Sequence, residues 1–239
     1  MMKNLIFVSL APVFIIALYI YIRDKYEKEP AGRLLLALLA GILIVPAIMV
    51  TETYLIRLGE DIKGLLQHLY IGFIVASLSE EGFKYLAFFL FIWRSSHFNE
   101  KFDGIVYAVF ISLGFAAVEN LLYVYRGGGY QVGLMRAFTA VPAHALFGVS
   151  MGFHFGLAKF YPAIRIRNLV LAFLIPFLWH GFYDFFLMAG TPYLVLLFVI
   201  MLVWLWIYGF NRMKVLSDRS VYRMTGLGKR SETNTSGRV

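Results

Sequence analysis

The sequence predicts an all-α, polytopic membrane protein with about seven transmembrane helices in one bundle. Three observations support this prediction: 60% of the 239 residues are hydrophobic, only 15% are charged, and long apolar stretches recur along the chain. Soluble globular domains are about half apolar and about a quarter charged. A helix rises about 1.5 Å per residue, so stretches of about 20 residues can cross a hydrocarbon core about 30 Å thick.

The apolar stretches are separated by polar or glycine-rich segments, such as Glu27-Lys28-Glu29-Pro30 and Gly127-Gly128-Gly129. Pro46 should kink the second helix, and Pro142 lies inside the fifth. No small-residue cleavage site follows the first stretch, so we expect it to be a helix and not a removed signal peptide. The expected helices cover residues 4–22, 34–56, 65–93, 103–125, 132–160, 168–188 and 193–210.

Residues 1–212 are expected to form one transmembrane domain that carries the functional site, followed by a tail. The tail, residues 213–239, is polar, basic and rich in Ser, Thr and Gly, so we expect it to be disordered. Sixteen Lys and Arg residues fall on one side of the expected helices and five on the other. The positive-inside rule then predicts a cytoplasmic C-terminus and an external N-terminus. The net charge of +8 is explained by this topology, and no nucleic-acid partner is expected.

The chain contains no cysteine, which excludes disulfides and thiolate chemistry. Any bound metal ion would have to be held by His, Asp or Glu side chains.

Ionisable side chains within the expected helices are the main functional signal, because a charge at the centre of a membrane helix costs about 2.5–3.5 kcal/mol. One such residue alone can simply hydrogen-bond neighbouring helices together. Several on four successive helices indicate a shared polar site. These four helices carry Glu80, Glu81, Glu119, His144, His154, His180, Asp184 and the single deep cation, Lys84, and a further acid, Glu52, lies on the helix before them.

Helical spacing predicts how some of these side chains interact. Glu80 and Glu81 precede Lys84 by four and three residues, so either carboxylate can reach the ammonium group. The four-residue spacing favours a pair between Glu80 and Lys84, which leaves Glu81 as the expected general base. His180 and Asp184 are also four residues apart, and a carboxylate in that position can fix the tautomer of the imidazole.

Carboxylates and imidazoles at this depth can activate water, bind a metal ion or relay protons. The two histidines could also polarise a peptide carbonyl group. Candidate metal ligands are His144, His180, Glu81 and Asp184, because three protein ligands and a water make a catalytic zinc site. The residues leave open whether the cofactor is a zinc ion or none.

Other protease motifs are weaker. The zinc motif H-E-x-x-H is absent, and no G-x-G-D motif follows Tyr183-Asp184. Residues 148–152 match G-x-S-x-G, but they fall within an expected helix and not on a strand–turn–helix elbow. We interpret Gly148 and Gly152 as a helix-packing surface beside His144. A serine protease that uses Ser150 and His180 is the alternative.

The order of these motifs resembles the PrsW family of bacterial intramembrane proteases, distant relatives of the CAAX prenyl endopeptidases. The resemblance covers most of the third to sixth helices. It rests on Glu80-Glu81-x-x-Lys84, on Gly114-Phe115-x-x-x-Glu119-Asn120-x-x-Tyr123, on His144 with Gly152, and on His180-Gly181-x-Tyr183-Asp184.

The resemblance implies a protease of the bacterial cell membrane that makes the first, external-side cut in a single-pass anti-sigma factor. That cut would start regulated intramembrane proteolysis in a stress response. The resemblance leaves open whether the enzyme is a metalloprotease or a glutamate-type protease. By position, the implied catalytic residues are Glu80, Glu81, Glu119, His144, His180 and Asp184, with Lys84 and Asn120 in support.

Three alternative functions remain at this point. CAAX relatives carry E-E-x-x-x-R and a histidine–asparagine pair, whereas this chain has E-E-x-x-K and the residues His180 and Asp184, so prenyl-protein cleavage is disfavoured. A proton- or ion-coupled transporter could use the same residues as a relay, but no inverted repeat is evident. A non-catalytic scaffold would use them only to hold helices together.

Overall fold

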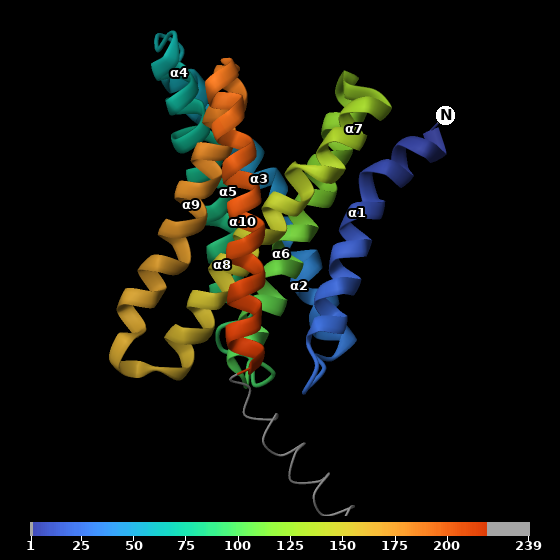
Figure 1. The fold of residues 1–239 in the computed structure, drawn as a ribbon, viewed down its shortest axis with the longest axis vertical. Coiled ribbons are helices and arrows are strands. Elements are labelled where there is room, and N and C mark those ends of the chain that lie inside the picture. Colours follow the sequence, from blue (N-terminus) through green and yellow to red (C-terminus); the bar gives the residue numbers. More distant parts are fainter. Residues whose placement is uncertain (1, 219–239) are drawn as a thin grey trace, which may run out of the picture.

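A computed structural model describes residues 2–218, and within this range all regular elements are helices (Figure 1). The elements are α1 (Met2–Arg23), α2 (Ala31–Leu43), α3 (Val45–Leu58), α4 (Leu65–Leu69), the π-helix η1 (Tyr70–Ser77), α5 (Leu78–Phe91), α6 (Lys101–Tyr123), the π-helical turn η2 (Val124–Gly128), α7 (Gly129–Phe138), α8 (Ala140–Phe160), the 3₁₀ turn η3 (Pro162–Ile164), α9 (Arg165–Ala189) and α10 (Pro192–Asp218). The all-α prediction is therefore confirmed.

Five stretches of the described chain are long and apolar enough to cross a membrane. One of them, Lys101–Phe160, contains both α6 and α8. The helical segment from α4 to α5 is also of membrane length, and it carries the charged residues Glu80, Glu81 and Lys84. The architecture is that of a polytopic membrane protein. The other four stretches are Asn4–Arg23, Ala31–Leu58, Pro162–Ala189 and Pro192–Ser217.

Two prolines divide stretches that look continuous in the sequence. The break between α2 and α3 falls at Ile44, two residues before Pro46, as expected for a kink there. The expected single helix 132–160 is wrong, because α7 ends at Phe138 and α8 begins at Ala140. Pro142 has no N–H to donate to the carbonyl of Phe138, and its ring clashes with that carbonyl, so the chain reorients just before it.

Helices α6 and α8 form the centre of the bundle and pack along each other most extensively among the described elements. α1 and α2 pack against α6, while α9 and α10 pack against α8 (Figure 1). A Cβ atom added to Gly152 would lie only 2.1 Å from the carbonyl oxygen of Gly104. The two backbones therefore touch, and the interpretation of Gly152 as a packing residue is confirmed.

The π-helix η1 directly precedes the glutamate pair and was not expected from the sequence. Its wider turn, with one extra residue between hydrogen-bonded groups, changes which side chains face α9. The Ser77 hydroxyl donates to the carbonyl of Phe177, and a Cβ atom on Gly72 would lie 3.0 Å from the carbonyl oxygen of Gly181. η1 thus fixes the start of α5 close to the helix that carries His180.

The last helix is longer than expected. α10 continues to Asp218, past the predicted end at residue 210, because Met213 and Leu216 are buried in the main hydrophobic core. Residues 219–239 of the expected tail lie outside the described residues.

Candidate active site

Side chains from three helices converge inside the bundle. Glu80 and Glu81 come from the first turn of α5, His144 from the second turn of α8, and His180 from α9. All four side chains are buried, and each offers a ligand atom that lies within 4.8 Å of the other three. This group is called the ligand cluster below.

Lys84 lies next to the ligand cluster and is fully buried. Its Nζ atom lies 2.7 Å from Glu81 Oε1, 3.2 Å from Glu80 Oε2 and 3.3 Å from His144 Nδ1. The ring of Phe115 lies 4.1 Å away on a further side. The ammonium group thus compensates the charge of both carboxylates.

The predicted preference of Lys84 for Glu80 is wrong, because its ammonium group is closer to Glu81. Contacts to Phe115 and His144 direct the lysine side chain, and helical spacing alone does not determine its closer partner. Glu81 also lies 2.9 Å from His180 Nδ1. Glu80 is therefore the less engaged of the two acids.

His180 lies between carboxylates. Its Nε2 atom lies 3.4 Å from Asp184 Oδ2 and 3.9 Å from Glu80 Oε2, while Nδ1 faces Glu81. The ring of Phe147 stacks on the imidazole with centroids 5.1 Å apart. The close approach of His180 to Asp184 is what the four-residue spacing predicted.

His144 is held from the opposite side by Glu119 of α6, whose Oε2 lies 3.0 Å from His144 Nε2. The same carboxylate accepts a hydrogen bond from Arg136 of α7. Arg136 Nε also donates to Asn120 Oδ1 over 2.9 Å, and the Asn120 amide donates to the carbonyl of Ser9 in α1. A network from α1 through α6 and α7 thus orients one histidine of the ligand cluster.

Sequence reasoning missed Arg136, which was counted only as a charge on the external side. One sequence feature could have identified it: Arg136 falls within the expected helix 132–160, eight residues and therefore about two turns before His144. Glu52 of α3 was named as an intramembrane acid without a role. It lies near enough to Glu119 and His180 to interact electrostatically with both.

Two other candidates lie apart from the ligand cluster. His154 Nδ1 lies 2.9 Å from Asn168 Oδ1, in a separate polar contact between α8 and α9. The Ser150 hydroxyl is buried and has no hydrogen-bond partner among the described residues. Ser150 is thus not hydrogen-bonded to His180, as a serine nucleophile would be to its base.

The ligand cluster fits a divalent metal ion. Two imidazoles and two carboxylates are the donor types that zinc and similar ions take in proteins. One buried oxygen, Glu81 Oε2, has no hydrogen-bond partner among the side chains and backbone that the structure describes, and a bound cation would satisfy it. The cluster contains three of the predicted ligands, and Glu80 takes the place predicted for Asp184, which contacts His180 instead.

Comparison with known proteins gives a consistent result. The sequence model described as "PrsW family intramembrane metalloprotease" matches residues 29–208. Three bacterial proteins named Protease PrsW are similar to the chain. The protein from Clostridioides difficile is 33% identical, and the alignment covers 92% of this chain and 94% of the relative. The protein from Geobacillus kaustophilus is 38% identical over 85% of this chain and 89% of the relative. The protein from Bacillus subtilis is 34% identical over 93% of this chain and 99% of the relative. No solved structure matches the chain.

Proposed function

Since the chain belongs to the PrsW family of intramembrane metalloproteases, we propose that the ligand cluster is the catalytic centre and that its substrate is a single-pass membrane protein. The observation that carries this proposal is the convergence of Glu80, Glu81, His144 and His180 within 4.8 Å. Buried charged residues of this kind are unfavourable in a membrane protein unless they pair or serve a function.

Three residues are assigned as metal ligands: His144, His180 and Glu81. Glu119 and Asp184 would hold the two imidazoles in position, as carboxylates behind metal-bound histidines generally do. A zinc ion held there would act as a Lewis acid, lowering the pKa of a bound water and polarising the scissile carbonyl group.

Glu80 is assigned as the general base, in place of the Glu81 expected from the sequence. Its side chain is 7% exposed, whereas that of Glu81 is fully buried, and its contact with Lys84 is the longer one. Glu80 can accept the proton of the attacking water and pass it to the leaving amine. Lys84 contacts both carboxylates and compensates their charge, so one can bind the ion while the other moves protons.

The position of the site supports a cut near the external surface. Glu119 lies four residues before the end of α6, and His144 four residues after the start of α8. Both therefore lie toward the same end of the bundle, the end where α6 ends and α8 begins, while Glu80 and Glu81 lie midway along the helical segment from α4 to α5. The positive-inside rule assigns that end to the outside, and an anti-sigma factor is the substrate that the family resemblance implies.

The test is cleavage in liposomes that contain the full-length protein and a single-pass anti-sigma factor of the same bacterium, tagged at both ends. Glu80→Gln should lower the cleavage rate about 10²–10⁴-fold, the usual contribution of a general base, while bound metal is retained. Ser150→Ala serves as the matched control and should cleave like the wild type. A Glu80→Gln protein that inserts normally and cleaves at the wild-type rate would refute the assignment.

A further inference from the structure

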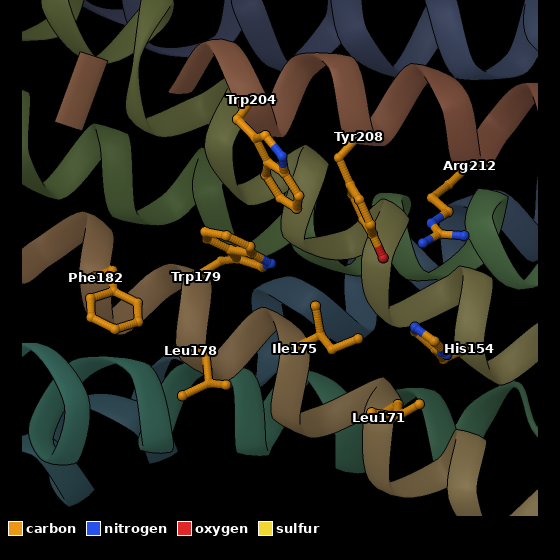
Figure 2. A pocket seen from close by; sticks show the side chains of 9 residues that line it. All are labelled: His154, Leu171, Ile175, Leu178, Trp179, Phe182, Trp204, Tyr208 and Arg212. Carbon is orange, nitrogen blue, oxygen red and sulfur yellow. The ribbon is translucent and has the colours of Figure 1, made fainter. Parts of the chain in front are cut away.

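A second feature of the structure is a cavity of about 530 Å³ that the ligand cluster does not use. It is lined by α9 and α10, with His154 contributed by α8 (Figure 2). Most of its wall is aromatic or aliphatic. Trp179 and Trp204 pack against each other there with ring centroids 4.4 Å apart, and Ile175 and Phe182 belong to the same wall.

One end of this cavity is polar. Figure 2 shows the Tyr208 hydroxyl, the Arg212 guanidinium and the His154 imidazole at the same end, away from Phe182. His154 is 93% buried (7% exposed), and its Nε2 atom has no hydrogen-bond partner within residues 2–218. The Tyr208 hydroxyl is likewise buried and has no partner in the part of the chain that the structure describes. Two buried polar groups that lack partners among the described residues indicate a ligand that supplies them.

The charge at this end is positive. Arg212 lies over the rings of Phe153 and Tyr208, 4.7 Å from each centroid, and no carboxylate among the described side chains pairs with it. Arg167 and Arg212 both lie near enough to His154 to interact electrostatically. An occupant of this end should therefore carry negative charge.

The position indicates the membrane interface. Arg212 lies near the end of α10, and His154 lies six residues before the end of α8. Lys159 and Arg165 flank the nearby connection from α8 to α9. This is the basic side of the protein, which the positive-inside rule assigns to the cytoplasmic leaflet, where anionic lipids are found.

We propose that this cavity binds one anionic phospholipid, with its phosphate between Arg212, Tyr208 and His154 and an acyl chain along Trp179, Trp204 and Ile175. An arginine and neutral donors are suited to a phosphate, and the apolar wall is suited to a hydrocarbon chain. The transmembrane helix of a protein partner is a poorer fit, because its own basic flank would face Arg212 at this side of the membrane.

Native mass spectrometry of the purified full-length protein tests the proposal, with dioleoyl phosphatidylglycerol, dioleoyl phosphatidylcholine and inorganic phosphate as separate probes. Phosphatidylglycerol should bind at least tenfold more tightly than phosphatidylcholine, and inorganic phosphate alone should not bind. Arg212→Gln should weaken phosphatidylglycerol binding about tenfold or more, because it removes charge-assisted hydrogen bonds to the phosphate. Lys214→Gln, an exposed cation two residues away on α10, is the matched control and should bind like the wild type.

Two further variants keep the test decisive if Arg212→Gln fails to fold. Tyr208→Phe removes only the hydroxyl and should weaken phosphatidylglycerol binding severalfold. Ile175→Trp fills the apolar part of the cavity and should weaken the binding of both lipids. The proposal would be overturned if the two lipids bound equally well, or if Arg212→Gln and Lys214→Gln had equal effects. It would also be overturned if inorganic phosphate alone saturated the site, or if a single-pass helical peptide displaced the lipid.

Discussion

At the residue scale, Lys84 and Glu119 organise the ligand cluster without belonging to it. Lys84 lies closer to Glu81 than to Glu80, which leaves the two adjacent acids in different environments. Glu119 contacts His144 from behind and is itself fixed by Arg136. The site therefore depends on residues from five helices, of which only three supply the clustered ligands.

Glu119→Gln is expected to lower zinc affinity and cleavage by about 10–100-fold, because a neutral amide holds the His144 ring less firmly and makes it less basic. Competition with a zinc-binding dye measures the affinity, and the liposome assay measures cleavage. Glu60→Gln, at an exposed acid between α3 and α4, should change neither. Equal affinities for the two variants would show that Glu119 does not position a ligand.

The sequence was sufficient to predict which residue types converge, but not all of their pairings. The spacing of His180 and Asp184 predicted their contact correctly, since both side chains belong to one helix. The closer approach of Lys84 to Glu81 depends on Phe115 and His144, which belong to other helices. Pairings across helices require the tertiary arrangement, which periodicity alone does not provide.

At the element scale, close backbone packing of α6 on α8 holds the bundle together. Gly104, Gly152 and Gly156 allow this contact, and their Cβ atoms would lie 2.1–2.4 Å from backbone oxygens of the facing helix. A backbone oxygen cannot rotate away as a side chain can. The distance between these two helices also sets the distance between Glu119 and His144, which lie on them.

Gly152→Ala is expected to destabilise the protein by about 1–3 kcal/mol or more, because the added methyl group forces α6 and α8 apart. The midpoint of thermal unfolding in detergent measures this effect. Gly32→Ala is the control, because Gly32 lies in α2 and no atom lies within 4 Å of a Cβ added there. Alanine has the higher helix propensity, so this variant should unfold at the wild-type midpoint or slightly above it. Equal midpoints for the two variants would contradict the packing account.

The sequence predicted the existence of most elements but not their interruptions. The kink before Pro46 was expected, whereas the separation of α7 from α8 before Pro142 was not. The π-helix η1 cannot be recognised from amino-acid composition, because contacts with α9 stabilise its geometry. One of these contacts is the hydrogen bond from Ser77 to the carbonyl of Phe177.

At the scale of the whole molecule, a second buried acidic group lies at the end of the bundle opposite the site. Asp24 follows α1, Glu29 precedes α2, and both are buried. Burial raises the pKa of each carboxyl group to about 7. The positive charge of Lys28 partly offsets this increase for Asp24. A hydrogen bond donated by the Tyr107 hydroxyl partly offsets the increase for Glu29. The connection from α1 to α2 is therefore most stable when these acids are protonated.

The stability of the protein should fall as the pH rises from about 5 to about 8. The unfolded chain releases these protons near pH 4, whereas the folded chain keeps them until about pH 7, so the folded state binds more protons in between. Asp24→Asn should reduce the dependence of stability on pH. It should raise the midpoint of thermal unfolding at pH 8 and change it little at pH 5. An unchanged slope in thermal unfolding between pH 5 and 8 would contradict this.

The central claim is that Glu81, His144 and His180 hold the catalytic metal ion of an intramembrane protease, with Glu80 beside it as general base, and removal and return of the metal tests this claim most directly. The wild-type protein in liposomes should lose cleavage when a chelator removes the bound metal. Cleavage should return when about one zinc ion per chain is restored, but not in His180→Ala protein. Wild-type cleavage by protein shown to be free of metal would contradict the account.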